Sequence, residues 1–375
     1  MLTKVLIIQP LVPKYRTPFF NRLLTSALFE INIISGRDSP FFSQSCASAE
    51  DFADLNHPTR TLLNGLFYWQ KKVWIPREFG RGDIIVLTGS PRLLNNYFLF
   101  FQARLKKMKV VWWGHGGNAS TEQEKLFIRR ILMRFADVLI LYMETEANFY
   151  IDLGFSSDRV FGLNNTIDTD AILKYKREWS IEQVNSFKLN HGFLRTVQLL
   201  FVGRLVKKCK LGIALEALQH LPSSYELIVI GDGLEMDEFQ LQARNVGVSH
   251  RVHWIGAVYE EECLAPYFMA ASCMIYPGNI GLSLMHSFAY GLPVITHDDS
   301  RTHGPEFSAL VNGVNGMTFQ RDNVLDLATK ILDLCGDRDR LTSMGHKAFE
   351  MMQMEFSIHH MVSTFIKALK KCTAI

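Results

Sequence analysis

Short apolar runs alternate with amphipathic stretches along most of the chain. In the first half the apolar runs lie at residues 5–9, 31–35, 84–87, 110–113, 138–142 and 160–163. In the second half they lie at residues 199–202, 226–230, 252–255, 274–276 and 294–296. Such alternation is typical of parallel β-sheets that are covered by helices on both faces. The pattern therefore predicts an α/β protein.

The same pattern divides the chain into two Rossmann-like domains. Residues 171–195 are charged and irregular, and we expect them to link an N-terminal domain, 1–170, to a C-terminal domain, 196–355. The length of 375 residues also favours two hydrophobic cores. We expect the last helix, 356–375, to cross back toward the N-terminal domain. Two such domains facing each other would form a cleft at the carboxyl ends of both sheets, where open α/β sheets bind ligands.

Composition and charge narrow the class of protein. Hydrophobic residues make up 48% and charged residues 21% of the chain, which is typical of a globular protein. The net charge of +3 argues for neither nucleic acid nor acidic polymers as partners. The six cysteines are scattered without a Cys-x-x-Cys pair, so we expect reduced thiols and neither structural zinc nor disulfides. The apolar run at the start ends at Pro10 without a signal cleavage site, and no run approaches the ~20 residues that span a bilayer. We expect a cytoplasmic protein.

A basic loop follows the first strand of the second half. Gly203 and Arg204 come directly after this strand, and Lys207, Lys208 and Lys210 come next. Arginine and lysine at the carboxyl end of a strand can neutralise a diphosphate leaving group, because the guanidinium matches phosphate oxygens in a bidentate way. The alternative is a solvated basic turn, which is the common fate of charge runs.

Two glycine-rich loops follow later strands. Gly231 and Gly233 form a tight turn after the strand that ends at Ile230. The segment Gly278-Asn279-Ile280-Gly281-Leu282-Ser283 follows another strand and opens a helix. A loop of this kind presents unpaired backbone N–H groups and the positive end of the helix dipole. It therefore predicts a site for phosphate or sugar hydroxyls.

The order of these motifs resembles glycosyltransferase family 4, the glycosyl transferases group 1, of the bacterial surface-polysaccharide type. The motifs are Gly-Arg-Leu, Ile-Gly-Asp-Gly, Trp-Ile-Gly, Pro-x-x-x-Gly-Leu-Ser and Gly-Leu-Pro-Val-Ile, in this order between residues 198 and 316. The resemblance implies the GT-B fold and transfer of a sugar from a UDP- or GDP-sugar to a glycan or lipid-linked glycan, with retention and without metal or cofactor. It suggests a role in lipopolysaccharide, O-antigen or capsule assembly.

The resemblance also implies roles for residues of the second half. Arg204 and Lys210 would stabilise the leaving diphosphate, although many relatives place the lysine at the position of Cys209. The amides of Gly281, Leu282 and Ser283 would hold the donor, together with Gly203, Gly231, Gly233 and Asn279. Glu306 lies where the family has a donor-site glutamate.

Two glutamates that the family places seven positions apart are absent here. Gly278 and His286 stand in their places. His286 would take over the contact with the ribose, since a neutral imidazole can hydrogen-bond a hydroxyl. The alternative is a helix residue packed in the crevice. Gly278 would leave recognition of the donor sugar altered.

The N-terminal half offers a histidine and a basic turn. His115 stands between Gly114 and Gly116 after a strand, where it can approach a ligand closely, and the family has a histidine near the reacting carbon at a comparable place. Its alternative role is to cap the following helix. Lys14 and Arg16 in the first loop are candidates for acceptor or phosphate binding.

Aromatic and basic residues occur together in this half, around residues 14–20, 67–74 and 100–107. Such mixtures suit an anionic membrane surface, so we hypothesise peripheral contact with the inner face of the cytoplasmic membrane. The alternative is that the aromatic side chains form the core. For function, the alternatives are a nucleotide-sugar epimerase of the same fold and a nucleotide-sugar-binding protein without activity.

Overall fold

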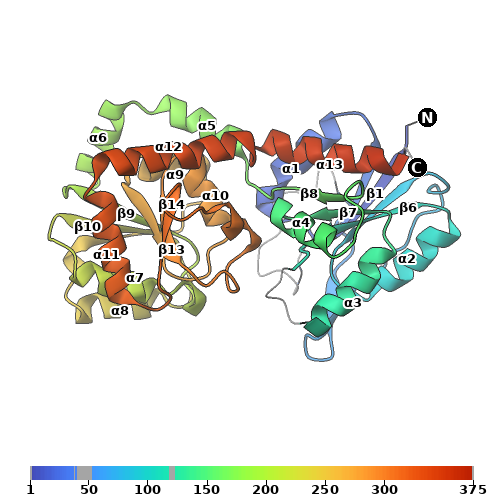
Figure 1. Ribbon diagram of the computed structural model, residues 1–375, viewed down its shortest axis with the longest axis horizontal. Coiled ribbons are helices and arrows are strands. Elements are labelled where there is room, and N and C mark those ends of the chain that lie inside the picture. Colours follow the sequence, from blue (N-terminus) through green and yellow to red (C-terminus); the bar gives the residue numbers. More distant parts are fainter. Residues whose placement is uncertain (1, 38, 40–52, 118–122, 374–375) are drawn as a thin grey trace. The chain divides into compact units, whose positions relative to one another are not determined.

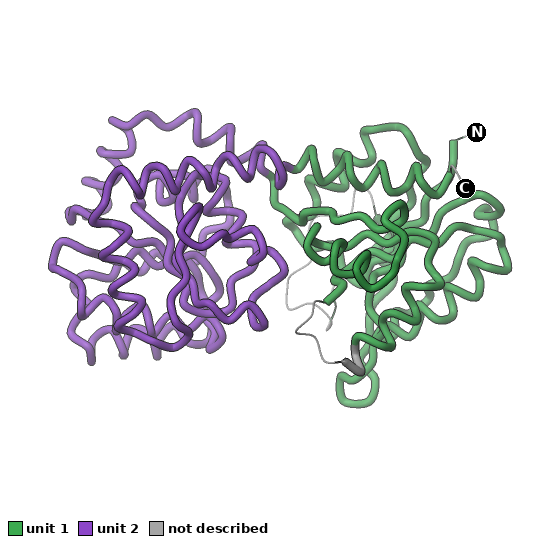
Figure 2. Tube along the Cα trace, viewed as in Figure 1, with its two compact units in different colours: residues 1–168, 358–375 green, residues 169–357 purple. Residues whose placement is uncertain are grey.

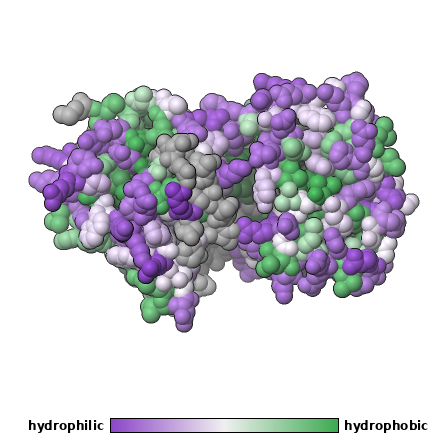
Figure 3. Space-filling model, turned by 180° about the vertical axis from the view of Figure 1, so that it is seen from behind, coloured by the Kyte–Doolittle hydropathy of each residue, from purple (hydrophilic) through white to green (hydrophobic). Residues whose placement is uncertain are grey.

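The computed structural model describes residues 2–37, 39, 53–117 and 123–373. The chain forms two compact units (Figure 2): unit 1 contains residues 1–168 and 358–375, and unit 2 contains residues 169–357. Each unit is built around one parallel β-sheet with helices on its faces (Figure 1). On the side seen in Figure 3, hydrophobic side chains are interspersed with hydrophilic ones on both units. The predicted pair of Rossmann-like domains is confirmed.

Unit 1 has a six-stranded parallel sheet in the order β2-β1-β5-β6-β7-β8. Its strands are β1 (Lys4–Leu11), β2 (Glu30–Gly36), β5 (Ile84–Thr88), β6 (Lys109–Gly114), β7 (Val138–Leu141) and β8 (Val160–Gly162). The predicted strands of the first half are all present. A hairpin of β3 (Thr59–Leu62) and β4 (Phe67–Gln70) is additional, and its turn places Leu63, Asn64 and Gly65 at positive φ.

The helices of unit 1 cover two separate cores. They are α1 (Thr17–Thr25), α2 (Asn95–Leu105), α3 (Gln123–Arg134), α4 (Glu144–Asp152) and α13 (Ile358–Thr373). Neighbouring residues of β6 point to opposite faces of the sheet, as the pleat requires. Trp113 packs against Phe19 of α1 and Phe365 of α13, whereas Trp112 packs toward Phe100 of α2. The C-terminal helix α13 thus belongs to unit 1.

Unit 2 has a six-stranded parallel sheet in the order β11-β10-β9-β12-β13-β14. Its strands are β9 (Val197–Val202), β10 (Tyr225–Ile230), β11 (Val252–Gly256), β12 (Cys273–Tyr276), β13 (Val294–His297) and β14 (Gly316–Phe319), of which β14 was not expected. This is the strand order of the dinucleotide-binding Rossmann fold, and the order reverses between β9 and β12. The covering helices are α7 (Leu211–Gln219), α8 (Met236–Asn245), α9 (Glu261–Ala270), α10 (Leu282–Tyr290), α11 (Val324–Cys335) and α12 (Arg338–Met354).

The segment that we expected to be an irregular linker, 171–195, forms helices of unit 2. They are α5 (Thr169–Glu178) and α6 (Ile181–Asn190), and Ser180 caps the latter. Ile172 and Val184 are buried. The Lys176 ammonium donates to the carbonyl of Tyr290 at 2.8 Å, and burial lowers the pKa of Lys176 to about 8. These contacts attach the segment to α9 and α10, so the chain passes between the units at residues 168–169 and 357–358.

The described cysteines, Cys209, Cys263, Cys273, Cys335 and Cys372, are free thiols; Cys46 lies outside the described residues. Within the described ranges, no helix is long and apolar enough to cross a bilayer. Among the same residues, no group of three or more His, Cys, Asp or Glu side chains is arranged to hold a metal ion.

Candidate functional site

The loops after β9, β10 and β12 lie backbone against backbone at the carboxyl edge of the unit 2 sheet. A Cβ atom at Gly231, which has a φ of +141°, would lie 1.9 Å from the carbonyl oxygen of Gly203. A Cβ at Gly233 would lie 2.2 Å from the carbonyl oxygen of Leu205. These approaches require glycine, because no side chain fits at such distances. The structure thereby brings together Gly203, Gly231 and Gly233 of the predicted donor site.

The loop after β12 completes this arrangement. The amide of Asn279 donates to the carbonyl of Lys208 at 3.2 Å. A Cβ at Gly278 would lie 2.1 Å from the same carbonyl oxygen. In this chain a glutamate therefore has no room at position 278. The close packing of these two loops leaves no space for the carboxylate that the family resemblance implies.

Both predicted phosphate-binding cations stand on the loop after β9. Arg204 is exposed. Its charge also acts on Tyr276 at the end of β12, where burial raises the pKa of the phenol to about 12 against the opposing effect of Arg204. Lys210 immediately precedes α7 with its backbone in the left-handed region, at a φ of 50°, and its ammonium forms an ion pair with Asp322. The two cations therefore lie at the edge of the sheet where its order reverses.

The glycine-rich loop opens α10 as predicted. The first helical turn leaves the amides of Gly281, Leu282 and Ser283 outside the hydrogen bonds of the helix, since the first bond runs from the Leu284 amide to the carbonyl of Gly281. Glu306 is buried beside this turn. Its Oε2 would lie 3.6 Å from a Cβ at Gly281 and 2.6 Å from one at Gly304. The structure thus brings Glu306 to the predicted donor loop.

A histidine that the sequence analysis missed ties this loop to the next one. His303 accepts a hydrogen bond from the Ile280 amide through Nδ1, at 3.0 Å, and donates through Nε2 to the carbonyl of His297, at 2.9 Å. A ring with one acceptor and one donor nitrogen is neutral, and burial lowers the pKa of His303. The ring also stacks between His297 and Phe307. Its position between a strand end and Glu306 is the only sequence signal for this role.

His286 takes the packed arrangement that we considered as the alternative. Its Nε2 lies 3.0 Å from a carboxylate oxygen of Glu261 on α9, and its ring stacks on Phe268. The hydroxyl of Tyr290 donates to the same carboxylate at 2.6 Å. Burial raises the pKa of Glu261, but the hydrogen bonds from His286 and Tyr290 outweigh this effect. The pKa is therefore lowered overall, and the carboxylate is favoured. A contact of His286 with ribose stays a prediction.

In unit 1, His115 follows β6 and is half-exposed. Its Nδ1 is hydrogen-bonded to the carboxylate of Glu146, which also accepts from the amides of Gly116, Tyr142 and Met143 at 3.1, 3.0 and 3.2 Å. A carboxylate can only accept, so Nδ1 donates in this hydrogen bond and Nε2 is the ring nitrogen outside it. The buried Glu146 was not predicted, although it stands at the third position of a helix, where capping glutamates are common.

The predicted acceptor residues lie at the same edge of the unit 1 sheet. Lys14 is exposed, whereas Arg16 is buried with its guanidinium carbon 4.8 Å from the ring centre of Trp113 and 5.0 Å from that of Tyr142. The ring of His115 stacks on Tyr142 with 6.3 Å between ring centres. The structure therefore groups Arg16 with His115. Acceptor binding by Lys14 and Arg16 stays a prediction.

The chain has recognisable relatives among known proteins. Residues 196–337 match the family described as Glycosyl transferases group 1. The lipopolysaccharide core biosynthesis glycosyltransferase LpsE of Rhizobium meliloti is 25% identical over 46% of this chain and 49% of its own length. An uncharacterized 41.2 kDa protein in the cps region of Klebsiella pneumoniae is 24% identical over 64% of this chain and 66% of its own length. The chain thus spans about half to two thirds of these relatives.

The fold is similar to that of Anabaena Alr3699/HepE in its complex with UDP. The two structures superpose with a TM-score of 0.74 and 16% identity over 98% of this chain and 100% of the other. The same Anabaena protein in complex with UDP-glucose superposes with a TM-score of 0.67 at 17% identity, over 98% of this chain and 99% of the other. The architecture is that of the GT-B glycosyltransferases.

Proposed function

We propose that the protein transfers a sugar from a UDP-sugar to a hydroxyl of a glycan or lipid-linked glycan, because residues 196–337 match the family described as Glycosyl transferases group 1. The choice of UDP is supported by the complexes of the Anabaena protein with UDP and UDP-glucose. Assembly of lipopolysaccharide, O-antigen or capsule is supported by the Rhizobium relative, whose name assigns it to lipopolysaccharide core biosynthesis.

One observation carries the proposal: the loops after β9, β10 and β12 converge where the strand order of unit 2 reverses, and Arg204 stands on one of them. Ligands of open α/β sheets bind at this place. The first-turn amides of α10 are suited to phosphate oxygens, and Arg204 and Lys210 supply positive charge. In the proposed complex, unit 2 holds the donor through these loops, the first-turn amides of α10, Arg204 and Lys210, and Glu306 contacts the donor sugar.

The proposed reaction proceeds with retention and without metal or cofactor. The acceptor hydroxyl forms a bond to the anomeric carbon while the bond from that carbon to the phosphate oxygen breaks, and UDP takes the electron pair. A phosphate oxygen of the donor accepts the proton of the hydroxyl. Arg204 and Lys210 stabilise the negative charge that develops on the diphosphate. This charge is larger in the transition state than in the bound donor, so the stabilisation lowers the barrier.

His115 has a proposed role on the sugar. Because Nδ1 is hydrogen-bonded to Glu146, Nε2 is the ring nitrogen proposed to hydrogen-bond a donor-sugar hydroxyl near the reacting carbon. Lys14 and Arg16 are proposed to bind the acceptor.

The test is nucleotide release and sugar transfer from a panel of UDP- and GDP-sugars, measured for the wild type, Arg204→Ala and Arg338→Ala. Arg338 is an exposed arginine at the start of α12 and serves as the matched control. We expect release of UDP by the wild type and the control, and a loss of about 10²–10³-fold in kcat for Arg204→Ala. Equal rates for all three proteins would refute the proposed role of Arg204.

Product analysis separates the rival functions. Conversion of the donor into an epimer without any acceptor would identify an epimerase. Tight binding of UDP without turnover, with glycan acceptors supplied, would identify a nucleotide-sugar-binding protein. Retention is tested separately by the anomeric configuration of the product.

A further inference from the structure

Helices α2 and α3 of unit 1 expose a row of large apolar side chains on their outer faces. On α2 these are Tyr97, Phe101 and Leu105, spaced four residues apart and therefore on one face of the helix. On α3 and directly after it they are Phe127, Ile128, Ile131 and Phe135. Phe101 and Phe127 are each 63% exposed. Large apolar surfaces of this kind mark sites of interaction with a protein or a membrane.

The inner faces of the same helices are also apolar. Leu99 and Ala103 of α2 and Leu132 and Met133 of α3 are buried in the core under the helices. A surface helix normally has one apolar and one polar face. The core accounts for only one of the two apolar faces here, so the outer row requires a different explanation.

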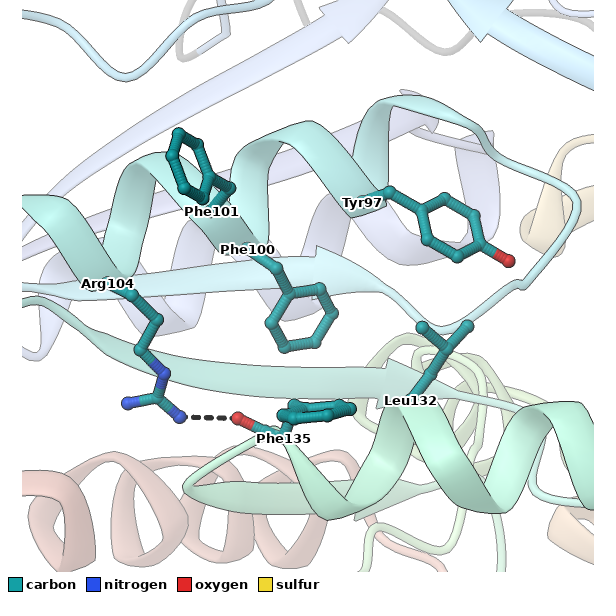
Figure 4. Close-up of a pocket in the computed structure, with 6 residues that line it drawn as sticks. All are labelled: Tyr97, Phe100, Phe101, Arg104, Leu132 and Phe135. Atoms are coloured by element: carbon teal, nitrogen blue, oxygen red, sulfur yellow. Dashed lines mark hydrogen bonds between the residues drawn. The ribbon is translucent and has the colours of Figure 1, made fainter.

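A recess between the two helices extends this apolar surface. It has a volume of about 280 Å³ and is lined by Tyr97, Phe100, Phe101, Arg104, Leu132 and Phe135. Figure 4 shows Tyr97 and Phe100 extending from α2 toward Leu132 and Phe135. The guanidinium of Arg104 donates to the carbonyl of Phe135 and forms an ion pair with Asp137 at 3.2 Å. This arginine thus joins the two helices beside the recess.

The charge around the row is positive. Among the described residues, α3 carries the basic side chains Arg129, Arg130 and Arg134, whereas the charge of Arg104 is paired with Asp137. Arg134 and the nearby Lys107 are exposed. A basic rim around an apolar face is complementary to anionic lipid headgroups above acyl chains. A second copy of the chain fits less well, because a symmetric contact would bring two basic faces together.

We propose that the outer faces of α2 and α3, with the recess between them, form a membrane-binding face for an anionic bilayer. Phe101, Phe127 and Phe135 enter the boundary between headgroups and acyl chains, and Lys107 and Arg134 contact the headgroups. The proposal narrows the sequence hypothesis: Phe19, Phe20 and Phe100 of the aromatic clusters are core residues. It does not depend on the proposed transferase activity.

The test is co-sedimentation of the full chain with vesicles of phosphatidylcholine mixed with phosphatidylglycerol, and with vesicles of phosphatidylcholine alone. The variant is Phe101→Asp combined with Phe127→Asp. The control is Leu325→Asp on α11 of unit 2, because Leu325 is 61% exposed and matches the exposure of the two phenylalanines. Thermal unfolding of all variants checks that these surface changes leave the folds intact.

We expect the wild type and the control to bind the anionic vesicles more tightly than the neutral ones. We expect each substitution by aspartate to weaken binding by about tenfold, because it removes the favourable transfer of a largely exposed phenylalanine ring from water into the bilayer. Equal binding by the double variant and the wild type would overturn the proposal. Absence of vesicle binding by the wild type would also overturn the proposal. If, in that case, sedimentation velocity shows a dimer of the wild type that the double variant does not form, the face is an interface between two copies of the chain.

Discussion

Replacement of His303 by leucine tests whether this buried ring holds the donor loop in place. The substitution removes two hydrogen bonds, from the Ile280 amide at 3.0 Å and to the His297 carbonyl at 2.9 Å. Leucine keeps an apolar contact with Phe307, so the main loss comes from these bonds. Because Ile280 is fully buried, its amide is left without its acceptor.

The magnitude follows from these contacts. The hydrogen bond to the His297 carbonyl contributes about 1 kcal/mol, and leaving the buried Ile280 amide unsatisfied costs about 1–3 kcal/mol. We therefore expect the free energy of unfolding of unit 2 to fall by about 2–4 kcal/mol, which lowers Tm by roughly 8 °C in a unit of this size. Since Ile280 lies between Gly278 and Gly281, we also expect UDP to bind about tenfold more weakly, which corresponds to about 1.4 kcal/mol.

Differential scanning calorimetry and titration calorimetry with UDP measure the two effects. His303→Gln is the matched control, because an amide side chain has both an acceptor and a donor and should recover part of each loss. An unchanged Tm for His303→Leu would refute the structural reasoning. A lowered Tm with unchanged UDP affinity would show instead that the loop does not bind the donor.

Three further predictions concern the loops of unit 2. Lys210→Gly should remove about 1 kcal/mol of left-handed backbone strain at a φ of 50°, so the urea concentration at the midpoint of unfolding should not fall. Turnover should nevertheless fall about 100-fold, because the positive charge is lost. A fall in both the unfolding midpoint and turnover would contradict this prediction. Gly231→Ala should lower the free energy of unfolding by at least about 2 kcal/mol more than Gly247→Ala does. The reason is that a Cβ at Gly231 would meet the Gly203 carbonyl, whereas Gly247 faces open space. Equal losses of stability would show that the loops relax. Burial lowers the pKa of His297 from 6.5 to about 4, so the neutral ring stabilises the fold above pH 6.5 and this contribution is lost as the pH falls toward 4. His297→Asn should therefore remove about 2–3 kcal/mol of the difference in unfolding free energy between about pH 7 and about pH 4.5, and an unchanged difference in urea titrations would refute the assignment.

The strands that could be predicted are those with a strong local signal. The runs at residues 5–9 and 274–276 are apolar on both faces of the sheet, so each strand is recognisable without its neighbours. β14 contains Gly316 and Thr318 and becomes a strand only by pairing with β13. The helices at 169–190 were missed because charged and polar residues outnumber apolar ones in both, and their stability comes from packing against α9 and α10.

The sequence by itself determined the pair of Rossmann-like units, the glycine-rich loops and the basic residues Arg204 and Lys210, because strand periodicity and turn chemistry act over a few neighbouring residues. The tertiary structure alone decided the partners of the site residues. Glu146 lies 31 positions from His115, Glu261 lies 25 from His286, and His303 lies 23 from Ile280. Contacts of this range depend on which strand ends the fold brings together, and local sequence patterns do not determine which strand ends become neighbours.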